Sequence, residues 1–149
     1  MKAKFKKAYM QTANVFARLS TAKRAQVGAI IVKDDRIISI GYNGMPSGWD
    51  NVCEEVVPPN EWAEFGQLKT KPEVLHAEAN AITKVAQSSD SSKGATLFCT
   101  HMPCIECAKL IHQSGISTVY YQVDYTAAKG SGEEFLTKSN IDVTRLTGE

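Results

Sequence analysis

Two short stretches of this sequence carry residues that could hold a metal ion: "HAEANAI", which begins at His76, and "PCIECAKLI", which begins at Pro103. Cys104 and Cys107 stand three positions apart at the predicted start of a helix, which places both sulfurs on one face of its first turn. The positive end of the helix dipole there favours the thiolate, which is the form that binds metals. With His76, the two cysteines would supply three ligands for tetrahedral zinc and leave the fourth position open.

Glu78, two residues after His76, supplies a carboxylate close to that open position. Water at an open zinc position ionises near pH ~7 instead of about 15.7, and a carboxylate that does not ligate the metal can carry protons. On an ideal helix, residues i and i+2 point about 200° apart, so we expect Glu78 to reach the water from the side of the cavity. The pattern therefore indicates hydrolytic chemistry.

Two other interpretations of the cysteine pair remain open from the residues alone. A CxxC motif beside a βαβ pattern could be a thioredoxin-like redox pair. A structural zinc site would instead need a fourth ligand. The chain contains four candidates for it: Cys53, Cys99, His101 and His112. A histidine that merely packs in the core beside an unrelated cysteine pair would leave Glu78 unexplained, so we favour a catalytic metal site.

The composition is that of an ordinary globular protein and excludes several classes. The chain has 149 residues, of which 43% are hydrophobic and 22% charged, so we expect one compact domain over residues 1–149. A net charge of +1 provides no large field for a polyanion, which argues against a nucleic-acid partner. The N-terminus begins basic, but polar residues interrupt every apolar run, so we expect neither an export signal nor a membrane span. The cysteines then suggest a cytoplasmic location.

The elements that must position these residues alternate between helices and strands. A helix over the first twenty residues precedes a hairpin, "VGAIIVK" and "RIISIGY", whose strands are separated by Asp34 and Asp35. The remaining elements follow in order: a helix over 74–87, a strand over 94–100, a helix over 103–115, a strand over 117–123, a helix over 132–140 and a strand over 141–146. Pro103 would lie in the first turn of its helix and Gly115 at the C-cap.

Residues 43–72 hold four of the five prolines, three of the ten glycines and both tryptophans, which predicts a long loop with a short helical piece at 60–66. Loops of this length are usually functional. The order of the other elements predicts an α/β domain in which helices cover a mixed sheet. Its hairpin would be antiparallel, and its later strands would be parallel through right-handed crossovers.

The two chemical stretches together match the H-x-E … P-C-x-x-C signature of zinc-dependent nucleobase deaminases. Within that superfamily the chain resembles the deoxycytidylate (dCMP) deaminases, because "QVGAIIV", "GYNGMPSG" and "SGISTVYY" also stand in that family's order, from Gln26 to Tyr125. The resemblance implies the cytidine-deaminase-like fold, a three-layer α/β/α sandwich with a mixed five-stranded sheet. It also implies one catalytic zinc per chain, held by His76, Cys104 and Cys107.

The resemblance further implies an enzyme that hydrolyses dCMP to dUMP and ammonia and so supplies dUMP for thymidylate synthesis. Water attacks C4 of the cytosine, and Glu78 protonates N3 before the amino group leaves. The alternative is the same chemistry on dCTP or another cytosine nucleotide, because one arginine could hold either a monophosphate or a triphosphate. A non-catalytic structural-zinc or redox module is the alternative of a different class.

The resemblance assigns contacts with the substrate as well. Asn43 resembles the residue that hydrogen-bonds the nucleotide, and Arg24 resembles the phosphate-binding position, with Lys23 as a weaker second. Tyr125 resembles the aromatic residue that packs on the pyrimidine. From the residues alone, Asn43 could instead favour a turn conformation and Tyr125 could simply pack. Some viral members carry a second zinc near the position of Cys53, but this loop has too few other cysteines and histidines for one.

Regulation and assembly are also implied by the resemblance. The family is typically hexameric, with a site at the subunit interface where dCTP activates and dTTP inhibits, and a triphosphate effector would bring Mg²⁺ with it. The corresponding residues here are Gly41, Tyr42, Asn43 and Gly44. Glycines at such a site let the backbone approach a ligand closely, although the segment could be an ordinary loop. The implied enzyme acts in the cytoplasm, or in the host cytoplasm for a viral source.

Overall fold

A mixed five-stranded sheet forms the centre of the protein, and the computed structural model describes residues 1–59, 66–126 and 130–147. The sheet has the order β2-β1-β5-β6-β7. Its strands are β1 (Gly28–Lys33), β2 (Arg36–Tyr42), β5 (Thr96–His101), β6 (Thr118–Val123) and β7 (Asp142–Arg145). Strand β1 runs antiparallel to both of its neighbours, whereas β5, β6 and β7 are parallel to one another. The predicted mixed sheet is confirmed.

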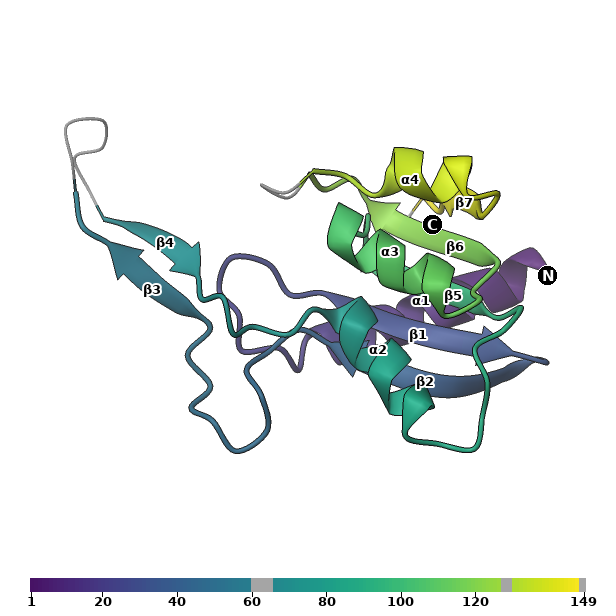
Figure 1. Ribbon diagram of the computed structural model, residues 1–149, viewed down its shortest axis with the longest axis horizontal. Helices are drawn as coiled ribbons and strands as arrows, with labels where there is room; N and C mark the ends of the chain where they lie inside the picture. The colour runs from purple at the N-terminus through teal and green to yellow at the C-terminus, as the bar shows by residue number, and fades with distance from the viewer. Residues whose placement is uncertain (60–65, 127–129, 148–149) are drawn as a thin grey trace.

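Helices cover both faces of this sheet, which gives three layers (Figure 1). One face carries α2 (Ala77–Ala86), α3 (Ile105–Gln113) and α4 (Glu133–Lys138), and the other carries α1 (Ala3–Ala17). Because successive side chains of a strand point to opposite faces, Ile31 packs under α2 and α3 while Ile30 packs against α1. The predicted α/β/α sandwich is therefore confirmed.

The predicted turn between β1 and β2 is observed, whereas the predicted ends of α3 are shifted. Asp34 and Asp35 adopt φ of 51° and 60°, which suits a two-residue turn whose twist matches that of the strands, and the predicted hairpin is confirmed. Cys104 is the N-cap of α3, so Pro103 lies before the helix and not in its first turn. Gly115, with φ of 83°, follows the C-cap residue Ser114. No helix in the described part of the chain is long and apolar enough to cross a lipid bilayer.

The prediction of one long loop over residues 43–72 was wrong. This segment contains a second, two-stranded sheet, formed by β3 (Glu54–Val57) and β4 (Gln67–Thr70), which pair antiparallel. In Figure 1 the hairpin projects away from the central sheet. Most of its side chains are exposed on both faces, so the pattern of buried residues that marks a strand is missing. The predicted helical piece at 60–66 falls almost wholly outside the described residues.

Candidate active site

Three predicted ligands meet where α2 and α3 begin. His76 is the N-cap of α2, Cys104 is the N-cap of α3, and Cys107 lies in the first turn of α3. The Nδ1 atom of His76 lies 3.6 Å from Sγ of Cys104 and 3.3 Å from Sγ of Cys107. With Zn–N near 2.0–2.1 Å and Zn–S near 2.3 Å, a tetrahedral ion would hold nitrogen and sulfur about 3.6 Å apart. The three residues therefore fit a zinc ion.

The number of ligands separates a catalytic from a structural zinc site. The three ligand atoms lie within 4.8 Å of one another. Within the described residues, no other side chain joins this group of possible ligands, and that includes the four candidates: Cys53, Cys99, His101 and His112. A structural zinc is almost always held by four protein ligands, whereas a catalytic zinc keeps one position open. The geometry thus favours the catalytic arrangement.

The backbone explains how His76 and Glu78 can serve one site although they stand two residues apart. His76 has the extended backbone of an N-cap, with φ of −75° and ψ of 150°, and the helix begins only at Ala77. The divergence of about 200° expected from ideal helical spacing therefore does not apply to this pair. Both side chains line the same cavity. The helix was predicted to begin before His76, and that boundary was wrong.

The pKa values of the two cysteines are shifted in opposite directions, which favours one thiolate in the pair. A hydrogen bond from Cys107 lowers the pKa of Cys104 to about 3, with further contributions from His76 and the helix backbone. The pKa of Cys107 is raised in turn, because it donates to Cys104 and is itself buried. This hydrogen bond therefore favours the thiolate form of Cys104. Binding of zinc would displace the proton from the other sulfur.

Glu78 is buried beside the ligands, with only 4% of its surface exposed. Burial raises the pKa of its carboxyl group, although its own backbone N–H, His76 and Cys107 partly offset that effect. Cys99, a buried residue of β5, also contacts Glu78, and burial followed by the charge of Glu78 raises the pKa of its thiol. A raised pKa makes a carboxyl group better suited to both taking up and releasing a proton.

A cavity of about 450 Å³ opens over this centre, a size typical of small-molecule sites. The metal ligands His76 and Cys104 line it together with Glu78. The cavity is also lined by three of the predicted substrate contacts: Arg24, Asn43 and Tyr125. Sequence reasoning missed the hairpin residues that line it as well: Glu54, Lys69, Thr70 and Lys71.

Asn43 has a structural role, because its side chain hydrogen-bonds to the backbone of the segment before β1. Its Oδ1 accepts a hydrogen bond from the N–H of Val27 at 2.9 Å, and its Nδ2 donates to the carbonyl oxygen of Ala25 at 2.9 Å. These bonds hold the chain that leads into β1 against the end of β2. Because the amide group carries a second N–H, contact with a ligand remains compatible with this task. The predicted contact with the nucleotide stays a prediction.

The other predicted contacts differ in their placement. Nη1 of Arg24 donates to Oγ1 of Thr70 at 3.3 Å, which ties Arg24 to the hairpin. Lys23 is not among the residues that line the cavity. Tyr125 is 41% exposed, and its ring stands edge-on to His101 with centroids 6.0 Å apart. Burial lowers the pKa of His101, which favours its neutral imidazole.

Residues 41–44, which are predicted to take part in regulation, end β2 and contact the start of α2. A Cβ atom on Gly41 would overlap the carbonyl oxygen of Ala77, so only glycine allows this approach of β2 to α2. Gly44 exchanges two backbone hydrogen bonds with Leu75, at 2.8 and 3.1 Å. Both glycines thus stabilise the start of α2. Their part in regulation stays a prediction.

Comparison with known proteins identifies the family. A model of the cytidine and deoxycytidylate deaminase zinc-binding region matches residues 3–123, and the chain belongs to this family of zinc-dependent deaminases. The predicted zinc centre of His76, Cys104 and Cys107 is confirmed by this membership and by the geometry.

Several relatives are deoxycytidylate deaminases. The chain is 42% identical to the human enzyme over 118 residues, which cover 78% of this chain and 63% of that one. It is 32% identical to the enzyme of Enterobacteria phage T4, with coverage of 90% and 86%. ComE operon protein 2 of Bacillus subtilis is 38% identical, with coverage of 78% and 58%. The chain thus spans about three fifths of the Bacillus and human proteins.

Solved structures agree with the fold described above. The dCMP deaminase of cyanophage S-TIM5, in complex with dCMP and dUMP, superposes with a TM-score of 0.85 at 43% identity. The match covers 98% of this chain and 99% of that one. The apo form of the same cyanophage protein gives a TM-score of 0.82. The cytidine-deaminase-like fold is therefore confirmed over nearly the whole chain.

Proposed function

We propose that this protein hydrolyses dCMP to dUMP and ammonia and thereby supplies dUMP for thymidylate synthesis. The observation that carries the proposal is the placement of a three-ligand zinc site and a buried carboxylate in one nucleotide-sized cavity. The similar human and phage T4 proteins are deoxycytidylate deaminases, which supports the proposal. The similar cyanophage protein binds dCMP and dUMP, which supports it further.

In the proposed reaction, Glu78 carries each proton that is transferred. A bound Zn²⁺ supplies Lewis acidity that makes water a nucleophile at neutral pH. Glu78 takes a proton from the water as its oxygen bonds to C4, and it delivers that proton to N3. The C4–N bond then breaks, and the amino group leaves as ammonia with a second proton that also passes through Glu78. The sum is cytosine plus water giving uracil plus ammonia.

The substrate contacts form part of the same proposal. The guanidinium group of Arg24 suits a terminal phosphate, which it can contact through two N–H groups. The remaining N–H of Asn43 can reach the nucleotide, and the ring of Tyr125 offers an apolar face to the pyrimidine. Lys23 is a weaker second contact for the phosphate, because its side chain would have to turn towards a cavity that it does not line.

A substrate panel tests the proposal. Zinc-loaded protein is given dCMP, dCTP, CMP and deoxycytidine, and the release of ammonia is followed. We expect the highest kcat/KM with dCMP and negligible turnover by the Glu78→Gln variant, because an amide cannot accept the proton. Faster consumption of dCTP would favour the alternative substrate, and turnover by metal-free protein would contradict the zinc chemistry.

We also propose that the enzyme is a cytoplasmic homo-oligomer, a hexamer by resemblance, in which dCTP with Mg²⁺ activates and dTTP inhibits. The tight contact of Gly41 with α2 supports the regulatory part of this proposal, because a ligand bound along residues 41–44 would contact a strand that packs directly on the helix after His76. Saturation with dCMP should then be sigmoidal, sharpened by dTTP and made hyperbolic by dCTP. A monomer by light scattering, with hyperbolic kinetics indifferent to both triphosphates, would remove this part of the proposal.

A further inference from the structure

The β3–β4 hairpin brings two lysines to the cavity that no sequence motif marks. We infer that Lys69 and Lys71 form, together with Arg24, a cationic wall that binds the 5′-phosphate dianion of the nucleotide. This inference rests on the proposed function, because it states where the phosphate of that substrate lies. On this inference, the hairpin allows the protein to distinguish nucleotides from nucleosides.

The balance of charge in the cavity supports an anionic ligand. Arg24, Lys69 and Lys71 all line the same cavity as the metal centre. Of the described residues that line it, only Glu54 and Glu78 are acidic, and Glu78 lies among the metal ligands. A phosphate monoester carries between about −1.5 and −2 charges at pH 7 because its second pKa is near 6. Such a group would offset the mutual repulsion of the three cations.

Glu54 does not cancel this positive charge, because its carboxylate is engaged with the backbone. The residue is buried, with 7% of its surface exposed. Its Oε2 accepts hydrogen bonds from the N–H groups of Lys23 at 2.8 Å and Arg24 at 3.0 Å. Because Glu54 is the first residue of β3, these bonds attach the backbone at Lys23 and Arg24 to the hairpin. The hydrogen bond from Arg24 to Thr70 adds a second connection, to β4.

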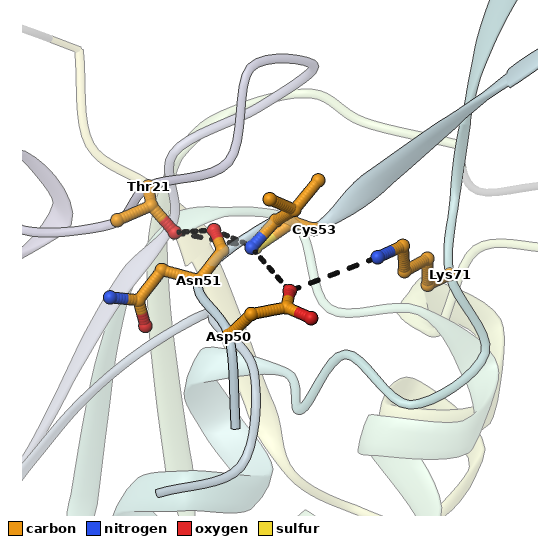
Figure 2. Close-up of polar contacts among 6 residues, drawn as sticks. Thr21, Asp50, Asn51, Cys53 and Lys71 are labelled. Atoms are coloured by element: carbon orange, nitrogen blue, oxygen red, sulfur yellow. Dashed lines mark hydrogen bonds and ion pairs between the residues drawn. The ribbon is translucent and has the colours of Figure 1, made fainter. Parts of the chain in front are cut away.

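Lys71 is positioned by its backbone and restrained only weakly by its side chain. Its N–H donates to the carbonyl oxygen of Cys53 at 2.8 Å. Its Nζ lies 3.9 Å from Oδ1 of Asp50 (Figure 2). The side chain of Lys71 is 24% exposed and that of Asp50 is 71% exposed, and a 3.9 Å ion pair with a largely exposed carboxylate contributes little. Thr21 donates to the carbonyl oxygen of Asn51 at 2.7 Å and so ties this segment to the chain before Arg24. Lys71 is thus held near the cavity and remains available to a more strongly charged partner.

Equilibrium binding of the product and of its nucleoside tests the wall without turnover. Calorimetric titrations with dUMP and with deoxyuridine compare zinc-loaded wild type with Lys69→Ala, Lys71→Ala and Lys71→Arg. The matched control is Lys138→Ala, which removes an exposed lysine of α4 that does not line the cavity. Each test substitution leaves the backbone hydrogen bonds of the hairpin in place, so folding should be retained, and thermal unfolding of every variant verifies this.

We expect each alanine variant at the wall to bind dUMP about 10-fold more weakly, as is typical for one lost hydrogen bond to a charged group. Affinity for deoxyuridine should stay within about twofold, because the nucleoside has no phosphate to contact. Lys71→Arg should restore most of the affinity for dUMP, since it keeps the charge. Lys138→Ala should match the wild type with both ligands.

Three results would overturn the inference: unchanged affinity of both wall variants for dUMP, equal losses with dUMP and deoxyuridine, or a wild type that binds dUMP no more tightly than deoxyuridine. Failure of the proposed function gives a different result. A protein that prefers dUMP through Lys69 and Lys71 but releases no ammonia from dCMP would refute the proposed reaction while supporting the cationic wall.

Discussion

Substituting Gly41 by alanine should damage the zinc centre without touching any ligand. A Cβ atom at this position would overlap the carbonyl oxygen of Ala77 and lie 2.6 Å from the amide nitrogen of Ala81. Both are backbone atoms of α2, so the helix would have to move by roughly 1 Å to restore an ordinary contact distance. His76 precedes this helix, and its Nδ1 lies 3.3 Å from Sγ of Cys107. Metal–ligand distances tolerate changes of only about 0.2 Å, so the displaced histidine should bind zinc poorly.

We expect Gly41→Ala to weaken zinc binding roughly 10- to 100-fold, the range found when groups that orient metal ligands are changed. Overpacking should also lower its free energy of unfolding by about 1–3 kcal/mol. Competition with a chromogenic chelator measures the first quantity, and urea titration of the chelated protein measures the second.

Two other glycines separate these effects. A Cβ atom on Gly28 would overlap the carbonyl oxygen of Ala13 in α1, and α1 carries no zinc ligand. Gly28→Ala should therefore lower stability by a similar amount while leaving zinc affinity unchanged. Gly44→Ala should change neither quantity, because its Cβ would meet nothing within 4 Å. If Gly41→Ala bound zinc as tightly as Gly28→Ala, the coupling between β2 and the metal centre would be refuted.

Three further substitutions test the ligands, the proton carrier and the fold. Cys107→Ala should purify without stoichiometric zinc, since one of three ligands is gone, and one zinc per chain by metal analysis would contradict the ligand set. Glu78→Gln should keep its zinc but lose roughly 10²–10⁴-fold in kcat, whereas loss of zinc would make Glu78 a ligand. Gly115→Ala should lower the free energy of unfolding by about 1–2 kcal/mol, because φ of 83° is unfavourable for a residue with a Cβ. An unchanged urea midpoint would show that this strain is relieved.

The zinc centre could be predicted because its signals are local. Cys104 and Cys107 are three residues apart at a helix start, and both helices begin where the ligands stand. Short-range spacing of this kind determines which side chains share a face. What the sequence could not supply was the helix boundary at His76, because helix ends depend on the geometry of the cap as well as on residue type. That boundary decides how His76 and Glu78 point into one site.

The β3–β4 hairpin could not be predicted, and the reason is physical. Its strands are only four residues long, and most of their side chains are exposed. Val56, Val57 and Thr70 favour strands, but the segments lack the regular alternation of apolar and polar residues that marks a half-buried strand. Their pairing joins Glu54 to Thr70, sixteen positions further along the chain, so no short window reveals it. The places of Lys69 and Lys71 beside the cavity follow from that pairing, which is why the motif-based substrate contacts did not include them.

The residues proposed to catalyse the reaction and the residues proposed to select the nucleotide therefore lie in different parts of the fold. The metal ligands and Glu78 stand at helix starts packed on the buried strands of the sheet, where a small displacement disrupts the geometry. The cationic wall stands mainly on an exposed hairpin with few contacts to the core. Changes in the hairpin should alter which nucleotide binds while leaving the metal geometry intact, whereas changes between β2 and α2 should do the reverse. Measuring zinc affinity and preference for dUMP over deoxyuridine in the same variants, Gly41→Ala and Lys71→Ala, would reveal whether the two properties separate in this way. Loss of both properties in both variants would show that hairpin and metal centre act as one unit.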